Sequence, residues 1–423
     1  MVESLEHIAK ELRKCVRCGA CRAHCPAFLE LGREPAAARG KIALTQHLLQ
    51  QDIQLDGGTY DAMSKCLLCG NCVTNCPNDV PTDKIVMAAR EALAEARGLT
   101  SFHKAVALVV RNSRLMKLGA AISAFLAPLI FRRIPATSGL RLRFPLPFVG
   151  NKRHIPAIAR RPFLGRHPET IAGKPGQPRI LYFVGCMTNF VYPDVGDAAL
   201  SLFQSLGCTI LIPQEQCCCG LPALSGGDLK TAYQLAKKNL MEIEAHQADY
   251  IVTSCATCGG ALHKFYPEVI GERFPDLGDR CRAVAEKSTD ALTLLAHLGF
   301  RYAGNTKEAG RTLSITYHDP CHARSRGILQ EPRQLLRGVP DIRLIEMEGA
   351  DKCCGLGGTF NVYHYETSLG INKGKTSSIL NTGADAVVTA CPGCMMQLSD
   401  GLKQQGSKTR VLHILQLLAG KHR

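Results

Sequence analysis

Residues 15–26 read Cys15-Val-Arg-Cys18-Gly-Ala-Cys21-Arg-Ala-His-Cys25-Pro26, and this stretch decides the fold of the first part of the chain. The same pattern returns at Cys66-Leu-Leu-Cys69-Gly-Asn-Cys72-Val-Thr-Asn-Cys76-Pro77. Four cysteines at this spacing, followed by proline, are typical of [4Fe–4S] sites in two-cluster ferredoxins, where the fourth cysteine of each run ligates the other cluster. We therefore expect two cubanes, one held by Cys15, Cys18, Cys21 and Cys76, and the other by Cys66, Cys69, Cys72 and Cys25.

A structural zinc site is the main alternative for these cysteines. Zinc is normally held by two separated Cys-x2-Cys pairs around a tetrahedron. A third cysteine, followed by a Cys-Pro pair, does not serve such a site, but it lets three thiolates reach three irons of one cluster. The small residues Gly19, Ala20 and Gly70 allow each loop to bend closely. The helical connection 26–65 and a helix expected at 80–98 then predict an all-helical domain around two clusters.

The composition is that of a folded protein with unusual cysteine use. Of the 423 residues, 46% are hydrophobic and 21% are charged, which is ordinary for a chain that buries a sizeable core. The 21 cysteines stand mostly in adjacent or Cys-x2-Cys pairs, and the charged start of the chain lacks the apolar segment of a secretory signal. We therefore expect a cytoplasmic metalloprotein rather than a disulfide scaffold.

Positive charge is concentrated in one segment. Residues 101–175 contain 14 lysines and arginines and a single acid, Glu169, so that +13 of the net charge of +15 lies there. The uncharged run 118–131 is too short for a confident membrane span and contains Pro128. We expect this segment to contact the cytoplasmic face of a membrane or an acidic partner subunit, with a solvated linker as the alternative. Nucleic-acid binding is not expected, because no aromatic residues interleave with the basic ones.

From residue 179 onward, expected strands alternate with expected helices. Apolar runs at 179–186, 208–213 and 249–255 are separated by helical patterns at 195–206 and 228–247, which predicts parallel βαβ units. Further strands are expected at 313–317, 342–347 and 385–391. Three cysteine landmarks repeat at offsets of 135, 135 and 136 residues: Cys186 with Cys321, Cys218-Cys219-Gly220 with Cys353-Cys354-Gly355, and Cys255-x2-Cys258 with Cys391-x2-Cys394. The chain therefore ends in two similar α/β lobes, expected to be related by a pseudo-twofold axis.

Each lobe carries five cysteines that follow expected strands, where loops at the carboxyl ends of a parallel sheet build sites. They are Cys186, Cys218, Cys219, Cys255 and Cys258 in the first lobe, and Cys321, Cys353, Cys354, Cys391 and Cys394 in the second. A cluster of unusual shape is favoured, since five thiolates exceed the four irons of a cubane; buried packing or a redox disulfide is the alternative. Cys208, Cys217 and Cys281 have no counterpart and are expected to be structural. The histidines show no ligand spacing, and only His318 and His322, which flank Cys321, are candidate ligands.

The order of these motifs resembles a known family. Two C-x2-C-x2-C-x3-C-P motifs, a linker and two lobes with the Cys-Cys-Gly signature are similar to the iron–sulfur subunit of glycolate oxidase and of the related D-lactate dehydrogenases. The resemblance implies an electron-transfer subunit that takes electrons from an FAD-containing 2-hydroxy-acid dehydrogenase subunit and passes them to a quinone or another acceptor. No residue of this chain is expected to act on the hydroxy acid itself.

The same motifs equally resemble the catalytic subunit of heterodisulfide reductase. By that resemblance, each set of five cysteines would hold a noncubane [4Fe–4S] cluster, and the chain would itself reduce a disulfide. Both sets are complete, so one or two further clusters beyond the two cubanes are expected, and this alternative stays open. A non-redox scaffold that uses zinc is a third class; a brown protein that absorbs near ~400 nm would exclude it.

Taken in chain order, these patterns predict an α plus α/β multidomain fold. An all-helical two-[4Fe–4S] ferredoxin domain is expected at 1–100, and a basic helix and linker at 101–178. A duplicated α/β Cys-Cys-Gly domain with parallel sheets is expected to follow, with its lobes at 179–305 and 306–423.

Overall fold

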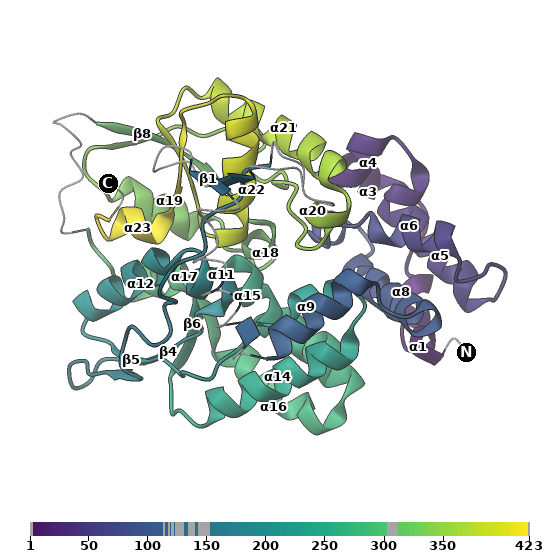
Figure 1. Cartoon of the computed structure of the whole chain (residues 1–423), viewed down its shortest axis with the longest axis horizontal. Helices are drawn as coiled ribbons and strands as arrows, with labels where there is room; N and C mark the ends of the chain where they lie inside the picture. Colours follow the sequence, from purple (N-terminus) through teal and green to yellow (C-terminus); the bar gives the residue numbers. More distant parts are fainter. Residues whose placement is uncertain are drawn as a thin grey trace.

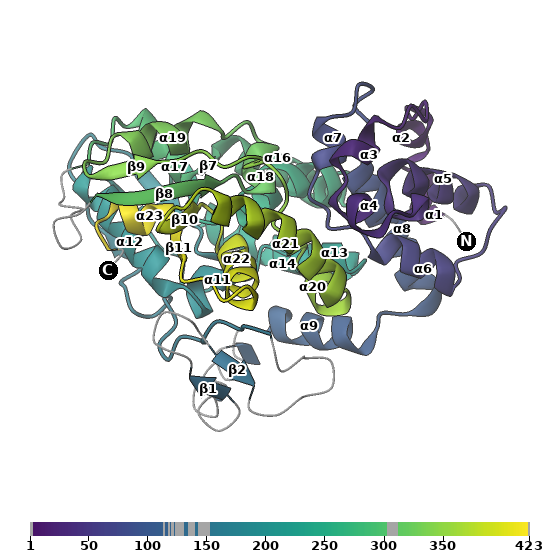
Figure 2. The same ribbon diagram turned by 90° about the horizontal axis from the view of Figure 1, so that it is seen from above.

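The computed structural model describes residues 3–112, 153–302 and 312–421, together with residues 115, 116, 119 and 122 and the short strands 131–133 and 140–142. A part made of helices, purple to blue in Figure 1, lies beside two α/β lobes that run from teal to yellow. Figure 2 shows the same helical part at one end of the molecule. The predicted fold class, a helical region followed by two lobes with parallel sheets, is therefore confirmed.

The N-terminal part is built around the long helix α8 (Thr82–Arg97). Its Ile85 and Val86 are fully buried, and α8 packs against α1 (Glu3–Glu6), α5 (Ala38–Leu49) and α6 (Gly57–Ser64). The start of the chain forms two short helices, α1 and α2. The other elements of this part are α2 (Ala9–Arg13), α3 (Ala20–His24), α4 (Pro26–Leu31), the 3-10 turn η1 (Glu34–Ala36), α7 (Asn71–Thr74) and α9 (Ser101–Arg111).

The first lobe contains a five-stranded sheet in the order β3-β5-β4-β6-β7. All neighbouring strands are parallel except β3, which pairs antiparallel with β5. The strands are β3 (Thr170–Ile171), β4 (Arg179–Tyr182), β5 (Thr209–Leu211), β6 (Tyr250–Thr253) and β7 (Ser288–Asp290). The helices are α11 (Gly185–Phe190), α12 (Pro193–Ser205), α13 (Leu221–Ser225), α14 (Leu229–Glu244), α15 (Ala256–Gly260), the π-helix η2 (Ala261–Gly271), α16 (Pro275–Lys287) and α17 (Ala291–His297).

The second lobe contains a four-stranded parallel sheet in the order β11-β10-β8-β9. This order repeats that of β7-β6-β4-β5, so the duplication seen in the cysteines extends to the sheet. The strands are β8 (Leu313–His318), β9 (Ile342–Leu344), β10 (Ala386–Thr389) and β11 (Arg410–His413). The helices are α18 (Cys321–Arg324), α19 (Gln330–Arg337), α20 (Phe360–Tyr363), α21 (Tyr365–Asn381), α22 (Pro392–Gln404) and α23 (Ile414–Leu418).

The two lobes share one hydrophobic core. Ile180 and Tyr182 of the first lobe lie in the same buried cluster as Ile315, Tyr317 and Leu415 of the second. Helix α12 contacts α23, and α17 contacts α19. Since α12 corresponds to α19 and α17 to α23 in the repeat, these two contacts are reciprocal, as at an interface with twofold symmetry. The arrangement agrees with the expected pseudo-twofold relation.

The basic segment 101–175 connects the helical part to the first lobe. Helix α9 ends at Arg111, and most of the uncharged run 118–131 lies outside the described residues. Strands β1 (Phe131–Arg133) and β2 (Leu140–Leu142) form an antiparallel pair. The strand β3 joins the first sheet before residue 179, so part of the expected linker contributes to the lobe. The expected domain boundaries at 100, 178 and 305 remain predictions.

Helices long and apolar enough to cross a membrane are absent from the part of the chain that the structure describes.

Candidate metal centres

Two loops of the helical part present the cysteines of the two motifs with the same backbone shape. Arg17 (φ 56°) and Gly19 (φ 86°) are left-handed in the first loop, and Leu68 (φ 52°) and Gly70 (φ 71°) are left-handed in the second. Positive φ is costly for residues other than glycine. Its recurrence at two equivalent non-glycine positions indicates that both loops are shaped to present their cysteines in the same way. The short helices α3 and α7 follow and carry the third cysteine of each motif.

The cysteines gather into the two predicted groups. Cys25 lies beside Cys66 and Cys69, and Cys72 lies beside all three. Burial raises the pKa of Cys25 to about 11 and that of Cys72 well above its usual value. The other four cysteines, Cys15, Cys18, Cys21 and Cys76, line one cavity beside these, and Cys72 also reaches its wall. Each group offers one thiolate for each iron of a cubane, so the donor sets fit two [4Fe–4S] clusters.

Two cationic side chains lie beside the group formed by Cys25, Cys66, Cys69 and Cys72. The ammonium group of Lys41 is buried and has Cys66 and Cys25 as charged neighbours. The guanidinium group of Arg90 donates to the carbonyl oxygens of Cys66 (2.7 Å) and Ser225 (2.7 Å), which joins the second motif to the first lobe. Cations at these positions offset the negative charge that thiolates bring. Sequence reasoning missed both residues, because each lies in a helix whose pattern indicates only packing.

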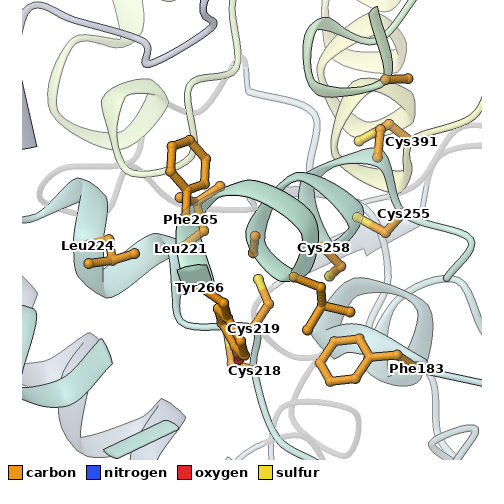
Figure 3. Close-up of a cluster of buried hydrophobic side chains, with 14 of the residues drawn as sticks. Phe183, Cys218, Cys219, Leu221, Leu224, Cys255, Cys258, Phe265, Tyr266 and Cys391 are labelled. Carbon is orange, nitrogen blue, oxygen red and sulfur yellow. The ribbon is translucent and has the colours of Figure 1, made fainter. Parts of the chain in front are cut away.

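The first lobe brings its five predicted cysteines to one end of its sheet. Cys186 is the second residue of α11. Cys218 and Cys219 follow β5, and Cys255 and Cys258 follow β6 (Figure 3). Their thiols contact one another in sequence, from Cys186 to Cys218, Cys219, Cys258 and Cys255. Contacts with Cys218, and then with Cys258, hold the pKa of Cys219 well below its usual value. The five sulfur atoms therefore form one continuous donor set.

The second lobe repeats this arrangement. The Sγ atoms of Cys354 and Cys394 are 3.5 Å apart, and Cys321 contacts Cys353. Contacts with Cys353, and then with Cys394, hold the pKa of Cys354 well below its usual value, as at the equivalent Cys219. All 21 cysteines are free thiols in the structure. Two buried sets of closely spaced thiols fit soft, thiolate-bound iron.

The three cysteines without a counterpart in the repeat, Cys208, Cys217 and Cys281, lie outside these sets. Cys208 and Cys281 are fully buried in the cores of the first lobe. The Sγ of Cys217 contacts the side-chain oxygen of Asn239 at 3.3 Å, and the same oxygen accepts from the backbone N–H of Cys217 at 2.9 Å. These surroundings agree with the structural role expected for all three.

The cysteines of the second lobe contact both those of the helical part and those of the first lobe. Cys69 of the helical part contacts Cys321 and Cys353, and Cys255 of the first lobe contacts Cys391. The contact with Cys321 lowers the pKa of Cys69, but the contact with Cys353 and burial outweigh it and raise that pKa to about 12. An apolar cavity lies at this junction, and six cysteines line it: Cys69 of the helical part and Cys321, Cys353, Cys354, Cys391 and Cys394 of the second lobe.

The histidines of the second lobe differ in their partners. The Nε2 of His322 pairs with the carbonyl oxygen of Leu68 at 3.2 Å, and that of His413 with the carbonyl oxygen of Ser254 at 2.9 Å. Neither ring nitrogen of His318 makes a hydrogen bond of ordinary distance and angle, although the residue is fully buried and the carbonyl oxygen of Ala350 lies beside its ring. Burial, helped by the nearby Lys375 ammonium group, lowers the pKa of His318 to about 3. Its ring is therefore neutral at physiological pH.

Comparison with known proteins identifies the family. A family described as a 4Fe-4S dicluster domain matches residues 11–80, and one described as a cysteine-rich domain matches residues 180–263 and again 315–399. Lactate utilization protein A of a Geobacillus strain is 33% identical over 57% of this chain and 98% of its own length. The chain belongs to the cysteine-rich-domain family of iron–sulfur oxidoreductase subunits.

Two further members of the cysteine-rich-domain family match nearly the whole chain. The probable glycolate oxidase iron-sulfur subunit of Bacillus subtilis is 29% identical over 96% of this chain and 93% of its own length. A subunit of the fumarate reductase (CoM/CoB) of Methanothermobacter marburgensis is 27% identical over 97% of this chain and 72% of its own length. Membership confirms the resemblance seen in the motifs and the assignment as an electron-transfer subunit that binds iron–sulfur clusters.

Proposed function

We propose that this chain carries electrons from an FAD-containing partner subunit, which oxidises glycolate or lactate, toward a quinone or another acceptor. The names of the Bacillus and Geobacillus relatives support this class of substrate. The observation that carries the proposal is that the cysteines of the helical part, the second lobe and the first lobe are in contact, Cys69 with Cys321 and Cys255 with Cys391. Electron transfer slows steeply with distance, so a relay needs its centres this close.

The proposed ligands are the predicted cysteines. One cubane is assigned to Cys15, Cys18, Cys21 and Cys76, and the other to Cys25, Cys66, Cys69 and Cys72. The two five-cysteine sets of the lobes are assigned to one further centre each. When bound, such a cluster supplies reversible one-electron chemistry. The chain holds and spaces the thiolates, places Lys41 beside them, and excludes water with the apolar side chains of Leu67, Leu221 and Leu356 at the junction.

We also propose that the basic segment 101–175 docks the flavoprotein partner, with the cytoplasmic face of a membrane as the second surface of suitable charge. Its single acid, Glu169, leaves the segment strongly positive, and long-range attraction would guide it to an acidic surface. The described end of α9 adds Leu108, which is 61% exposed, so apolar contact would accompany the charge.

The test is electron transfer into the chain itself. Anaerobically purified chain is mixed with the flavoprotein partner and either glycolate or lactate, and absorbance is followed near ~400 nm, where thiolate-bound iron absorbs. Wild-type chain should lose absorbance as it is reduced, whereas Cys18→Ser and Cys69→Ser should each lose one cubane and stop the transfer. Cys281→Ala, at a buried cysteine outside the sulfur groups, is the matched control. Unchanged transfer in both serine variants would refute the proposal.

The apolar cavity at the junction favours a second candidate function. It is bounded by sulfur atoms of the second lobe, and it could admit a disulfide to a reactive centre. Iron and sulfide analysis separates the candidates in part: about eight irons per chain would mean that only the two cubanes are present, and about sixteen that both lobes are loaded. Reduction of a disulfide by the isolated chain with a reduced viologen dye would then put the disulfide reductase first.

A further inference from the structure

The two lobes differ at one position that faces their cysteines. The repeat aligns Tyr182-Phe183-Val184-Gly185-Cys186 with Tyr317-His318-Asp319-Pro320-Cys321. Phe183 therefore occupies in the first lobe the place that His318 occupies in the second. Phe183 packs in the same buried cluster as Cys219 and Cys258, and Figure 3 shows these side chains in one view. An apolar ring in one lobe is thus replaced by a ring with two nitrogen atoms in the other.

The ring of His318 lies next to two sulfur atoms. A ring nitrogen and the Sγ atoms of Cys354 and Cys394 all lie within 4.8 Å of one another, and all three residues are buried. Across the described residues, this is the only trio of histidine, cysteine or acidic side chains whose ligand atoms all lie within 4.8 Å of one another. The equivalent trio of the first lobe consists of Phe183, Cys219 and Cys258, which leaves it with two donors.

The protein itself leaves the nitrogen atoms of His318 unsatisfied. Neither makes a hydrogen bond, although buried polar groups are nearly always paired because an unpaired one is costly. The carbonyl oxygen of Ala350 lies beside the ring, but it already accepts from the N–H of Asp319 (3.1 Å) and from the Nζ of Lys375 (3.0 Å). Those two bonds use both of its lone pairs. The described residues therefore offer the imidazole no free polar partner.

We propose that a ring nitrogen of His318 ligates the same iron centre as Cys354 and Cys394, so that the second lobe holds a thiolate–imidazole centre. The inference rests on the metal centre proposed above for this lobe. Neutral imidazole is a common iron ligand, and one nitrogen can bind iron while the other keeps its proton. The first lobe, with Phe183 in the same place, offers thiolates alone. The two lobes of the repeat thus hold chemically different centres.

Different ligands give the two centres different potentials. Both lobes offer five thiolates, so the imidazole acts on the potential by taking the place of one of the five on an iron, which removes a negative charge; in Rieske centres this replacement raises the reduction potential. The centre of the second lobe should therefore accept an electron at a higher potential than the centre of the first lobe. The second lobe also lies next to Cys69 of the helical part, so the imidazole would act on the centre that adjoins the cubanes.

The experiment detects nitrogen bound to iron. Wild-type chain is prepared anaerobically with natural histidine and with ¹⁵N-labelled histidine, and pulsed EPR is recorded during a redox titration. We expect a strong nitrogen coupling that changes with the label, in the centre that is reduced at the higher potential. His318→Phe copies the first lobe and should lose this coupling. His322→Gln, at the neighbouring histidine that already pairs with Leu68, should keep it.

The outcomes separate the inference from the proposed function. Iron in both lobes, with only weak or absent nitrogen coupling in wild-type chain, would overturn the ligation by His318 and leave the electron-transfer role intact. A coupling that survives in His318→Phe would also overturn it. Iron confined to the two cubanes would overturn both the inference and the proposed centres of the lobes. The wild-type measurement needs no variant, and unchanged cubane signals in His318→Phe show that this variant has folded.

Discussion

Lys41 places a buried positive charge beside the group formed by Cys25, Cys66, Cys69 and Cys72. Its Nζ donates to the carbonyl oxygens of Pro35 (2.8 Å) and Ala36 (2.6 Å), and Cys66 and Cys25 are its charged neighbours. Burial lowers the pKa of this lysine, and the neighbouring thiolates oppose that change. A cation at this place favours the more negative, reduced state of the centre that the cysteines hold.

Replacing Lys41 should therefore change both potential and stability. In Lys41→Met, the centre at Cys66 should be reduced at a lower potential than in wild-type chain, as measured by spectroelectrochemical titration. Loss of the bonds to two carbonyl oxygens should also lower the free energy of unfolding by about 2 kcal/mol. Lys84→Met, in a surface ion pair with Glu272, is the control and should leave the potential unchanged. A wild-type potential in Lys41→Met would contradict this electrostatic role.

At the residue scale, the sequence predicts the sulfur donors but only some of their neighbours. The spacing of cysteines is strict because each must reach a different iron, and so a motif is enough to find them. The exchange of Phe183 for His318 is visible in the repeat, since both precede an aligned cysteine by three positions. Lys41 is not visible, because a lysine in an amphipathic helix is usually solvated, and its burial depends on packing against η1.

Among the structural elements, α17 begins at a buried acid. Asp290 ends β7, and its Oδ1 accepts from the backbone N–H of Leu292 at 2.9 Å. Burial raises the pKa of Asp290 from 3.8 to about 6, and the cap bond and the nearby Arg326 only partly offset this. Folding therefore disfavours the charged carboxylate. The stability contributed by its neutral form is fully present below about pH 3.8 and is lost as the pH rises through about 6.

Asp290→Asn should remove this pH dependence and keep the cap. At about pH 7 the variant should be more stable than wild-type chain by up to about 3 kcal/mol, which corresponds to a shift of about two pKa units. Near pH 4 the two chains should be equally stable. Denaturant unfolding of the anaerobic protein, measured across this pH range, checks the prediction. An equal difference at every pH would show that the carboxyl group titrates normally.

At the element scale, the parallel strands were predictable and the edge strand β3 was not. Strand β4 is a short apolar run and β8 alternates apolar and polar residues, and each is followed within four residues by a cysteine, which marks the carboxyl end of the sheet. β3 has only two residues, Thr170 and Ile171, inside a segment rich in proline and arginine. Two residues cannot show an alternating pattern, so this edge strand could not be predicted and its residues were assigned to a linker.

In the whole molecule, α9 offers an exposed apolar surface at the start of the basic segment. Leu108 is 61% exposed and Val109 is 43% exposed. If the flavoprotein docks here, Leu108→Asp should weaken its binding at least tenfold, which is about 1.4 kcal/mol, measured by titration calorimetry. Met241→Asp, at a side chain that is 58% exposed on α14, is the matched control. Equal affinities of the Leu108→Asp variant and wild-type chain would place the docking surface elsewhere.

The joining of the three parts was beyond prediction from the sequence. Cys69 and Cys321 are far apart in the chain, and no local pattern says that their side chains meet. The contact depends on how the helical part sits on the lobes, through pairs such as Arg90 with Ser225 and Arg273 with Glu91. Such pairs form between surfaces whose complementarity appears only after each part has folded.

The reciprocal contacts of α12 with α23 and of α17 with α19 also say something about ancestry. A single lobe on its own would expose the faces of α12 and α17, or of α19 and α23, that now pack against the other lobe. An ancestral gene that encoded one lobe would therefore have produced a chain that folded stably only by pairing with a second copy of itself. Fusion of the two copies freed each half to change independently, and the exchange of phenylalanine for histidine beside the cysteines is a change that no symmetric dimer could have made on one side alone.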